Sequence, residues 1–224
     1  MADYGAMIVL DNGNPFVTPQ STPFCLYQKV VVNSGANGVA VAEIPIDPSY
    51  PAIAFCRVSN TTAPTFTHAG RVGGVIRVSS GTPVGAANTP HTLTAYIFAI
   101  FPQTLPAWGF AIWDAAGKLV LTNESRVLSD LVTVGTPGAG GGINIDQTLA
   151  GSWAVAPATL GMSLWQTMVQ GQPVIISVMA YTGCRFDGVN TRINAVSNQT
   201  GQGSPAGGSN TGIVLTAINT AAYD

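Results

Sequence analysis

The chain has 224 residues, enough for one large domain or two small ones, and only 8% of them are charged, against about 25% in an ordinary soluble domain. The net charge is −2 and the Lys and Arg residues are not clustered, so the sequence lacks the concentrated basic face that nucleic-acid binding requires. No segment approaches the roughly 18 consecutive apolar residues of a membrane helix, because residues 93–113 are interrupted by Pro102, Gln103 and Pro106. We therefore expect no nucleic-acid partner and no membrane insertion, and an uncharged surface that is buried between subunits.

The N-terminal sequence and the cysteines indicate where the chain is made. Met-Ala-Asp-Tyr-Gly lacks the cationic and apolar regions of a signal peptide, so we expect synthesis and assembly in a cytosol. Cys25, Cys56 and Cys184 are too few and too scattered for a disulfide framework or a zinc site. They are predicted to be buried reduced thiols.

The first predicted element is a β-hairpin over residues 4–18, and residues 108–122 repeat it. Both segments begin with an aromatic residue and Gly, continue through an apolar strand, turn at a tip that contains Asp and Gly, and end in Thr. Asp with Gly at a tip suits a tight hairpin. Trp108 takes the place of Tyr4, so we expect it to have a structural role at the first strand of the repeat.

Other segments recur in the same order along the two halves. The matching pairs are 51–56 with 173–178, 75–79 with 193–197, and 93–95 with 215–217. Ordered matches of this kind indicate an internal duplication. They predict two related domains, residues 1–105 and 106–224, with a linker around 101–107 and a Gly-rich insertion near 135–152 in the second copy.

Between these landmarks the sequence consists of short runs rich in β-branched and aromatic residues, separated by turn signals. This pattern predicts an all-β fold of two tandem antiparallel β-sandwich or jelly-roll-like domains. Residues 160–169 are the only segment compatible with a helical turn or two. The apolar run 174–176 is expected to be buried on both faces, in a central strand or under a neighbouring domain or subunit.

Two Gly-rich segments are candidate contact loops at one end of a β-domain. Residues 135–142 are expected to be exposed or ordered by a partner, and a plain flexible insertion is the alternative. Residues 200–208 have a shorter equivalent at 81–90. Trp153 and Trp165 near the insertion suit a carbohydrate platform, although core packing is the simpler interpretation. The candidate assembly or receptor contacts are Gly138, Gly140, Gly141, Trp153, Trp165, Gln202 and Ser204.

The groups that catalysis requires are scarce, so we expect no catalytic residue, cofactor or metal site. No Gly-x-Ser-x-Gly motif accompanies His68 or His91, which are predicted to lie on the surface or to pack within loops. The carboxylates occupy turn or strand-end positions, where capping and solvation are their ordinary roles. Those considered are Asp114, Glu124, Asp130, Asp146 and Asp187. The protein is predicted not to be an enzyme.

Residues 1–5 and 108–122 resemble a family of small tail proteins from long-tailed, siphovirus-like bacteriophages. Family members begin with an aromatic-Gly hairpin and repeat it midway, and this chain departs from the pattern at Val9, Pro15 and Pro19. The resemblance implies a tail tip, baseplate or tail fibre component of the virion, and it transfers no site residues.

Three functions follow as expectations. The first is a structural tail protein, assembled in the host cytoplasm, that forms a homo-oligomer and contacts other virion tail proteins. The second is a receptor-binding module that recognises a host surface glycan or pilus. The third is a capsid decoration or head-tail joining protein.

Overall fold

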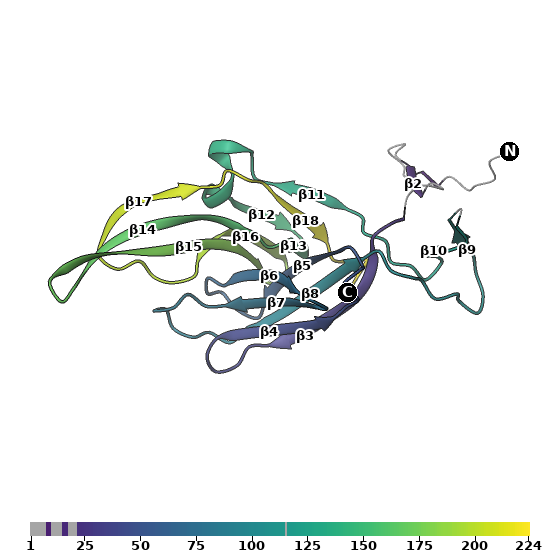
Figure 1. The fold of residues 1–224 in the computed structure, drawn as a ribbon, viewed down its shortest axis with the longest axis horizontal. Helices are drawn as coiled ribbons and strands as arrows, with labels where there is room; N and C mark the ends of the chain where they lie inside the picture. The colour runs from purple at the N-terminus through teal and green to yellow at the C-terminus, as the bar shows by residue number, and fades with distance from the viewer. Residues whose placement is uncertain (1–7, 10–14, 18–21, 115) are drawn as a thin grey trace.

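The computed structural model describes residues 8–9, 15–17, 22–114 and 116–224, and within them the chain forms β-strands, two 3-10 turns and no α-helix (Figure 1). The all-β prediction is confirmed. The helical alternative for residues 160–169 is wrong. They belong to strand β14 (Thr159–Val169), which is paired along its length with β15 (Gln172–Phe186), so its backbone groups are bonded to a neighbouring strand.

The first half contains two groups of three antiparallel strands. β8 lies between β3 and β5, and β7 lies between β4 and β6. A core of alternate side chains fills the space between the groups, with Ile44 and Val78 on one side and Leu93 and Ile97 on the other. The bounds are β3 (Cys25–Asn33), β4 (Val39–Pro45), β5 (Ala52–Ser59), β6 (Phe66–Val72), β7 (Val75–Gly81) and β8 (Thr92–Ala99).

The second half also places two groups of strands around one core. β18 lies between β11 and β13, and β16 lies between β12 and β15. The core includes Val134, Leu160, Ile193 and Leu215. The bounds are β11 (Leu131–Val134), β12 (Asp146–Ala150), β13 (Trp153–Val155), β16 (Asn190–Ser197), β17 (Ser204–Asn210) and β18 (Leu215–Asn219).

A third apolar cluster joins the two halves. Phe55 and Phe98, on the outer face of β5 and β8, pack with Ala154 and Ile218 of the second half and with Tyr223. β8 is therefore covered on both faces, and Leu93–Ala99 are all buried. Backbone bridges from Cys56 to Val155, from Thr67 to Thr182 and from Val58 to Arg185 connect the strands into one large mixed sheet.

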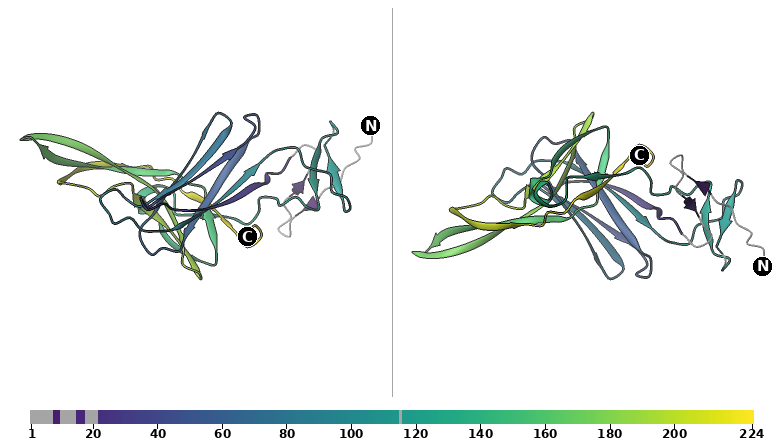
Figure 2. Two further views of the ribbon diagram at one scale, coloured as in Figure 1. Left: turned by 90° about the horizontal axis from the view of Figure 1, so that it is seen from below. Right: turned by 90° about the horizontal axis from the view of Figure 1, so that it is seen from above.

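Two small sheets lie at one end of the molecule, beyond the body formed by these cores (Figures 1 and 2). β9 (Ala111–Trp113) pairs with β10 (Leu119–Thr122), which confirms the hairpin predicted over residues 108–122. β1 (Ile8–Val9) pairs antiparallel with β2 (Pro15–Val17), and the rest of the hairpin predicted over 4–18 lies outside the described residues.

A three-stranded arm extends from the opposite end (Figures 1 and 2). It consists of β14, the first half of β15, and β17 on the other edge of β14. The turn between β14 and β15 places Gln170 at φ 49° and Gly171 at φ 78°. Positive φ at both central residues is the geometry of a type I′ hairpin, whose twist matches that of the strands.

Candidate assembly surfaces

Exposed large apolar side chains lie at both ends of this elongated molecule, and others, among them Val31 in β3 and Val72 in β6, lie elsewhere on the described surface. At the end with the small sheets, Trp108 is 78% exposed, and Leu105, Phe110 and Trp113 are also exposed. On the arm, the exposed apolar residues are Met168, Val169, Val174 and Ile175. An apolar patch on a protein surface is typical of a contact with another molecule. The two ends are therefore candidate assembly surfaces.

Residues 174–176 are not buried within the chain itself, so the central-strand alternative is wrong, and burial under a neighbouring subunit stays a prediction. Val174 is 39% exposed and Ile175 is 53% exposed, and only Ile176 is partly covered. The reason is that β15 is 15 residues long and its first half extends beyond the core of the second half into the arm. An apolar run along the chain identifies a strand but does not locate the end of the core.

Trp165 and Ser204 lie close together on the arm, and Gln202 lies between Gly201 and Gly203, which approach Trp165 and Gln166. The Trp165 indole N–H donates to Ser163 Oγ at 3.0 Å, and its ring packs on Gly201 so closely that a Cβ at that position would overlap it. Ser204 pairs with Gln166 of β14, beside the pairing of Pro205 with Trp165. The expected loop over 200–208 is thus wrong from Ser204 onward, because backbone pairing with β14 makes these small residues strand β17.

Trp153 lies away from the arm, in β13. Its side chain is partly buried against the core of the second half, and its indole N–H donates to the Ala150 carbonyl at 2.7 Å. Its backbone N–H donates to Thr191 Oγ1 at 3.0 Å. This placement agrees with core packing.

The Gly-rich run is folded against the chain itself. Gly138 and Gly140 lie in the 3-10 turn η1 (Gly138–Gly140), and the turn η2 (Gly142–Asn144) follows. Gly138 N–H donates to the Gly212 carbonyl at 2.9 Å. Gly141 is buried, and a Cβ there would overlap the carbonyl oxygen of Gly212. Small residues are needed here because two backbone segments lie in direct contact.

The exposed aromatic residues beside β9 were not among the predicted site residues. Trp108 was expected to have a structural role at the first strand, but it precedes β9 and its side chain faces solvent. Sequence gives no direct signal for this exposure, because an apolar strand that packs on a core and one that is displayed at an end have the same composition.

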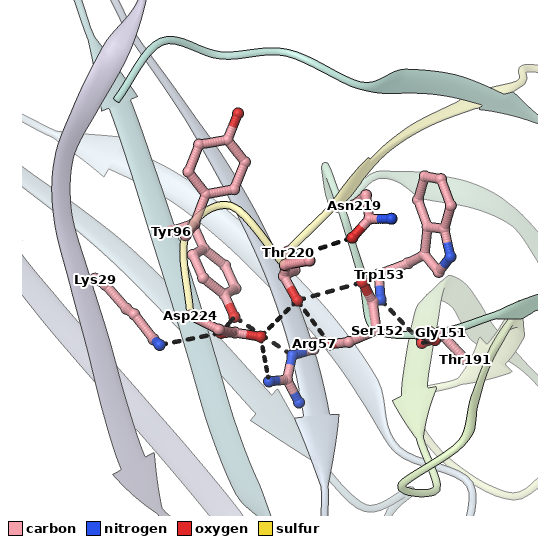
Figure 3. Close-up of polar contacts among 12 residues, drawn as sticks. Lys29, Arg57, Tyr96, Gly151, Ser152, Trp153, Thr191, Asn219, Thr220 and Asp224 are labelled. Atoms are coloured by element: carbon pink, nitrogen blue, oxygen red, sulfur yellow. Dashed lines mark hydrogen bonds and ion pairs between the residues drawn. The ribbon is translucent and has the colours of Figure 1, made fainter. Parts of the chain in front are cut away.

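A polar cluster around Asp224 connects the two halves near the third apolar cluster (Figure 3). The Asp224 carboxylate accepts hydrogen bonds from Tyr96 Oη at 2.5 Å and Thr220 Oγ1 at 2.8 Å. It also pairs with Lys29 Nζ at 3.0 Å and with Arg57 at 3.4 Å. Lys29, Arg57 and Tyr96 belong to the first half and Thr220 to the second, so these contacts tie the halves together.

Ionisation in this cluster follows from its contacts. Burial and the Asp224 carboxylate raise the pKa of Tyr96 to about 12. Partial burial acts to raise the pKa of Asp224, but hydrogen bonds from Tyr96, Thr220 and Lys29 and the charge of Arg57 outweigh it and lower that pKa. Asp224 is therefore a carboxylate held by mutually satisfied partners. The arrangement suits a structural joint between the two halves.

The histidines and cysteines are located as follows. His91 is 3% exposed, and its Nε2 lies 2.8 Å from Ser80 Oγ, which is also buried, so this Ser-His pair is closed to a substrate. Its Nδ1 lies 3.0 Å from the Thr89 carbonyl, which fits the predicted packing within a loop. His68 is exposed in β6, which agrees with the predicted surface position. The prediction for the cysteines is confirmed, because Cys25, Cys56 and Cys184 are buried and unpaired.

Three of the five acidic residues considered, Asp114, Asp146 and Asp187, have contacts at turns or strand ends. Asp114 accepts from the backbone N–H of Lys118 at 2.8 Å, and Asp187 accepts from that of Asn190 at 2.7 Å. Asp146 forms a bidentate pair with Arg192 at 2.7 and 2.8 Å. Among the described residues, no group of three or more His, Cys, Asp or Glu side chains is arranged to hold a metal ion.

A cleft of about 560 Å³ lies where the two halves meet, on the side of β5. Arg57, Asn60 and Thr61 line it from the first half, and Phe186 and Asp187 line it from the second. The Arg57 guanidinium lies 5.1 Å from the centre of the Phe186 ring. This mixture of an aromatic ring and hydrogen-bonding groups suits a small polar ligand.

Comparisons with protein-family models, with curated proteins and with solved structures find no significant match to this chain. In the part of the chain that the structure describes, no helix has the length and apolar character to cross a membrane.

Proposed function

We propose that this protein is a structural component of a bacteriophage tail, at the tail tip, baseplate or a fibre, that forms a homo-oligomer and contacts other tail proteins. The observation that carries the proposal is the placement of exposed apolar side chains at both ends of an elongated β-structure. A subunit with contacts at opposite ends can be linked into a larger assembly.

The low charge of the chain supports burial in an assembly. Charged residues make up 8% of the sequence, and none lies between Asp146 and Arg185, a stretch that includes β14 and the first half of β15. Uncharged surfaces associate with little mutual repulsion, and the cores of subunit interfaces are depleted of charged residues. The polar cluster at Asp224 and the shared apolar cluster would keep the two ends in a fixed relation.

We also infer that the chain consists of two tandem related β-domains of the sandwich or jelly-roll type. The order β3-β8-β5 has a counterpart in β11-β18-β13, and the order β4-β7-β6 has one in β12-β16-β15. Two of the four sequence matches fit this correspondence, 75–79 with 193–197 and 93–95 with 215–217, and the two hairpins belong to separate small sheets. The match of 51–56 with 173–178 does not fit. It aligns β5 with β15, whereas the strand order makes β13 the counterpart of β5 and β6 the counterpart of β15.

A receptor-binding module is the second candidate function, and the cleft between the halves favours it. Arg57, Asn60 and Asp187 offer donors and acceptors around Phe186, as the recognition of a host glycan would require. The exposed Trp108 and Trp113 provide a further surface on which a sugar ring can stack.

Antibody labelling of phage particles tests the proposal. Particles are collected from cells that express the gene, and a gold-conjugated antibody to the purified chain is located by electron microscopy. Label at the distal end of the tail is the expected result. Label on the capsid would instead indicate a decoration or joining protein, and unlabelled particles that lack the chain would refute a virion role. A purified chain that stays monomeric and adsorbs to host cells would favour the receptor-binding module.

A further inference from the structure

One edge of the arm is an unpaired strand edge. Residues 172–179 of β15 pair with β14 on one side, and the pairing with β16 begins only at Ala180. On the other side, Asn198 N–H donates to the Met179 carbonyl at 2.9 Å and Gln199 Nε2 donates to the Ser177 carbonyl at 3.2 Å. Among the described residues, no strand pairs with β15 on that side between Pro173 and Ser177.

The backbone groups that point out of this edge follow from the hairpin. In a hairpin with a two-residue turn, the flanking residues Val169 and Gln172 form a hydrogen-bonded pair. From Gln172 onward, the backbone N–H and C=O groups of successive residues of β15 point alternately toward β14 and away from it. Pro173, Ile175 and Ser177 therefore direct their backbone groups away from β14. The bond that Ser177 accepts from Gln199 has the same direction and agrees with this assignment.

We propose that a second copy of this chain pairs with this edge, antiparallel and about a two-fold axis at Ile175. The inference rests on the proposed function and deepens it, because it identifies a second copy as the partner on the arm and β15 as the contact. Antiparallel pairing of two identical strand edges creates a two-fold interface in which both copies use the same residues.

The hydrogen-bonding pattern of the edge is complementary to itself. With the axis at Ile175, the two Ile175 residues exchange N–H to carbonyl bonds, and each Ser177 N–H faces the Pro173 carbonyl of the other copy. The reverse bond would need an N–H on Pro173, which proline lacks. The acceptor of that missing bond would be the Ser177 carbonyl, which Gln199 already satisfies. Hence no buried acceptor is left without a donor in this register.

The backbone groups that Asn198 and Gln199 already bond also limit the length of the strand pairing between the two copies. Asn198 and Gln199 occupy the edge beside Met179 and Ser177, so strand pairing ends at Ser177 of one copy and Pro173 of the other. A shift of register would place Pro173 opposite an unsatisfied carbonyl or bring the second strand against Asn198. The edge therefore selects one alignment.

The side chains on the same face are uncharged, and Met168, Pro173 and Ile175 among them are apolar. Met168 is the cross-strand neighbour of Pro173, and Ile175 is 53% exposed beside Gln166. In the paired arrangement the two Ile175 side chains become direct neighbours and cover each other. The opposite edge of the arm, β17, is less suited to pairing because it contains Pro205, Gly207, Gly208 and a register shift.

The first experiment measures the mass of the purified full chain by light scattering and by sedimentation over a wide range of concentration. The wild type is expected to form a dimer. Ile175→Lys, which places two charges at the axis, is expected to weaken the dimer by about tenfold or more. Met168→Lys is the matched control, because Met168 is 63% exposed on the same face but one strand farther from the axis. This control is expected to retain the dimer.

Disulfide capture places the axis. Ile175→Cys is expected to form a covalent dimer under mild oxidation, because Cα atoms in a hydrogen-bonded antiparallel pair lie about 5.5 Å apart, within disulfide range. Met168→Cys is expected to remain reduced. The native cysteines do not interfere because all three are buried.

A wild type that is monomeric at every concentration overturns the inference, as does a dimer that Ile175→Lys leaves intact or that Met168→Cys captures equally well. Circular dichroism of each variant confirms that the fold is retained. The presence of the chain in phage particles is measured independently, so a labelled tail together with an insensitive or absent dimer refutes this inference and leaves the proposed place in the tail standing.

Discussion

Tyr223 is the side chain whose removal is expected to do most damage to the joint between the two halves. It is 1% exposed, and its ring packs edge-on against Phe98 at a centroid distance of 4.9 Å. Its hydroxyl donates to the Val127 carbonyl at 2.8 Å and accepts from the Ser129 N–H at 2.8 Å. One residue thus fills an apolar space against the first half and satisfies two backbone groups of the second.

Two variants separate these contributions. Tyr223→Phe retains the ring but leaves the Val127 carbonyl and Ser129 N–H without this partner, which should lower the free energy of unfolding by about 1–3 kcal/mol. Tyr223→Ala also empties the space between the halves, and removal of a buried aromatic side chain costs about 3–5 kcal/mol.

Equilibrium urea unfolding, followed by both circular dichroism and tryptophan fluorescence, measures the loss. Val72→Ala is the control, because Val72 is 81% exposed and its truncation should change stability by no more than about 0.5 kcal/mol. Unfolding in two separate transitions for Tyr223→Ala would mean that the halves now unfold independently. A cost below about 1 kcal/mol for Tyr223→Ala would refute the assignment of Tyr223 to this joint.

Three further predictions follow from the polar cluster, the thiols and the arm. Folding lowers the pKa of Asp224, so its contribution to stability is complete above the unfolded carboxyl pKa of about 3.9 and is lost as pH falls through the lower folded value. The difference in unfolding free energy between wild type and Asp224→Asn should therefore shrink in acid. A difference that does not vary with pH would contradict this. Burial raises the pKa of Cys25 to about 11 and that of Cys56 to about 12. A thiol reagent at neutral pH should therefore label the cysteines only after denaturation. Rapid labelling of the native protein would argue against their burial. Gly201→Ala should displace the Trp165 ring and destabilise the arm by about 1–3 kcal/mol. Faster hydrogen exchange of the backbone amides of β14 and β17 would report this loss. Unchanged protection from exchange would show that the arm accommodates a methyl group there.

Much of the secondary structure could be predicted from the sequence, because hairpins and strands depend on neighbouring residues. The hairpin over 108–122 was predicted from its apolar strands and Asp-Gly tip, and the carboxylate of Asp114 holds that tip by accepting from the N–H of Ala116 and Lys118. The burial of the cysteines was also predictable. The prediction of two related domains remains a prediction, and so does the assignment to a phage tail.

The candidate site was less predictable. Trp165 and Ser204 do lie close together, but the Gly-rich run packs on Gly212 and Trp153 on the second core. The contacts of Asp224 join residues from both ends of the chain, since Lys29 and Asp224 are 195 positions apart, and no local pattern records such a pairing. The Ser80–His91 pair was also missed, because the two residues meet only when β7 and the segment before β8 fold together.

The sequence by itself determined that this protein is built of strands, that its cysteines are buried and that its surface is short of charge. Those properties depend on composition and on local periodicity, which every stretch of the chain carries. Only the tertiary structure decided which apolar strands are covered. β8 and the start of β15 are both apolar runs, yet β8 lies between two packed halves while Val174 and Ile175 extend beyond the core into solvent. Burial depends on what lies on each face of a strand, and those neighbours come from distant parts of the chain.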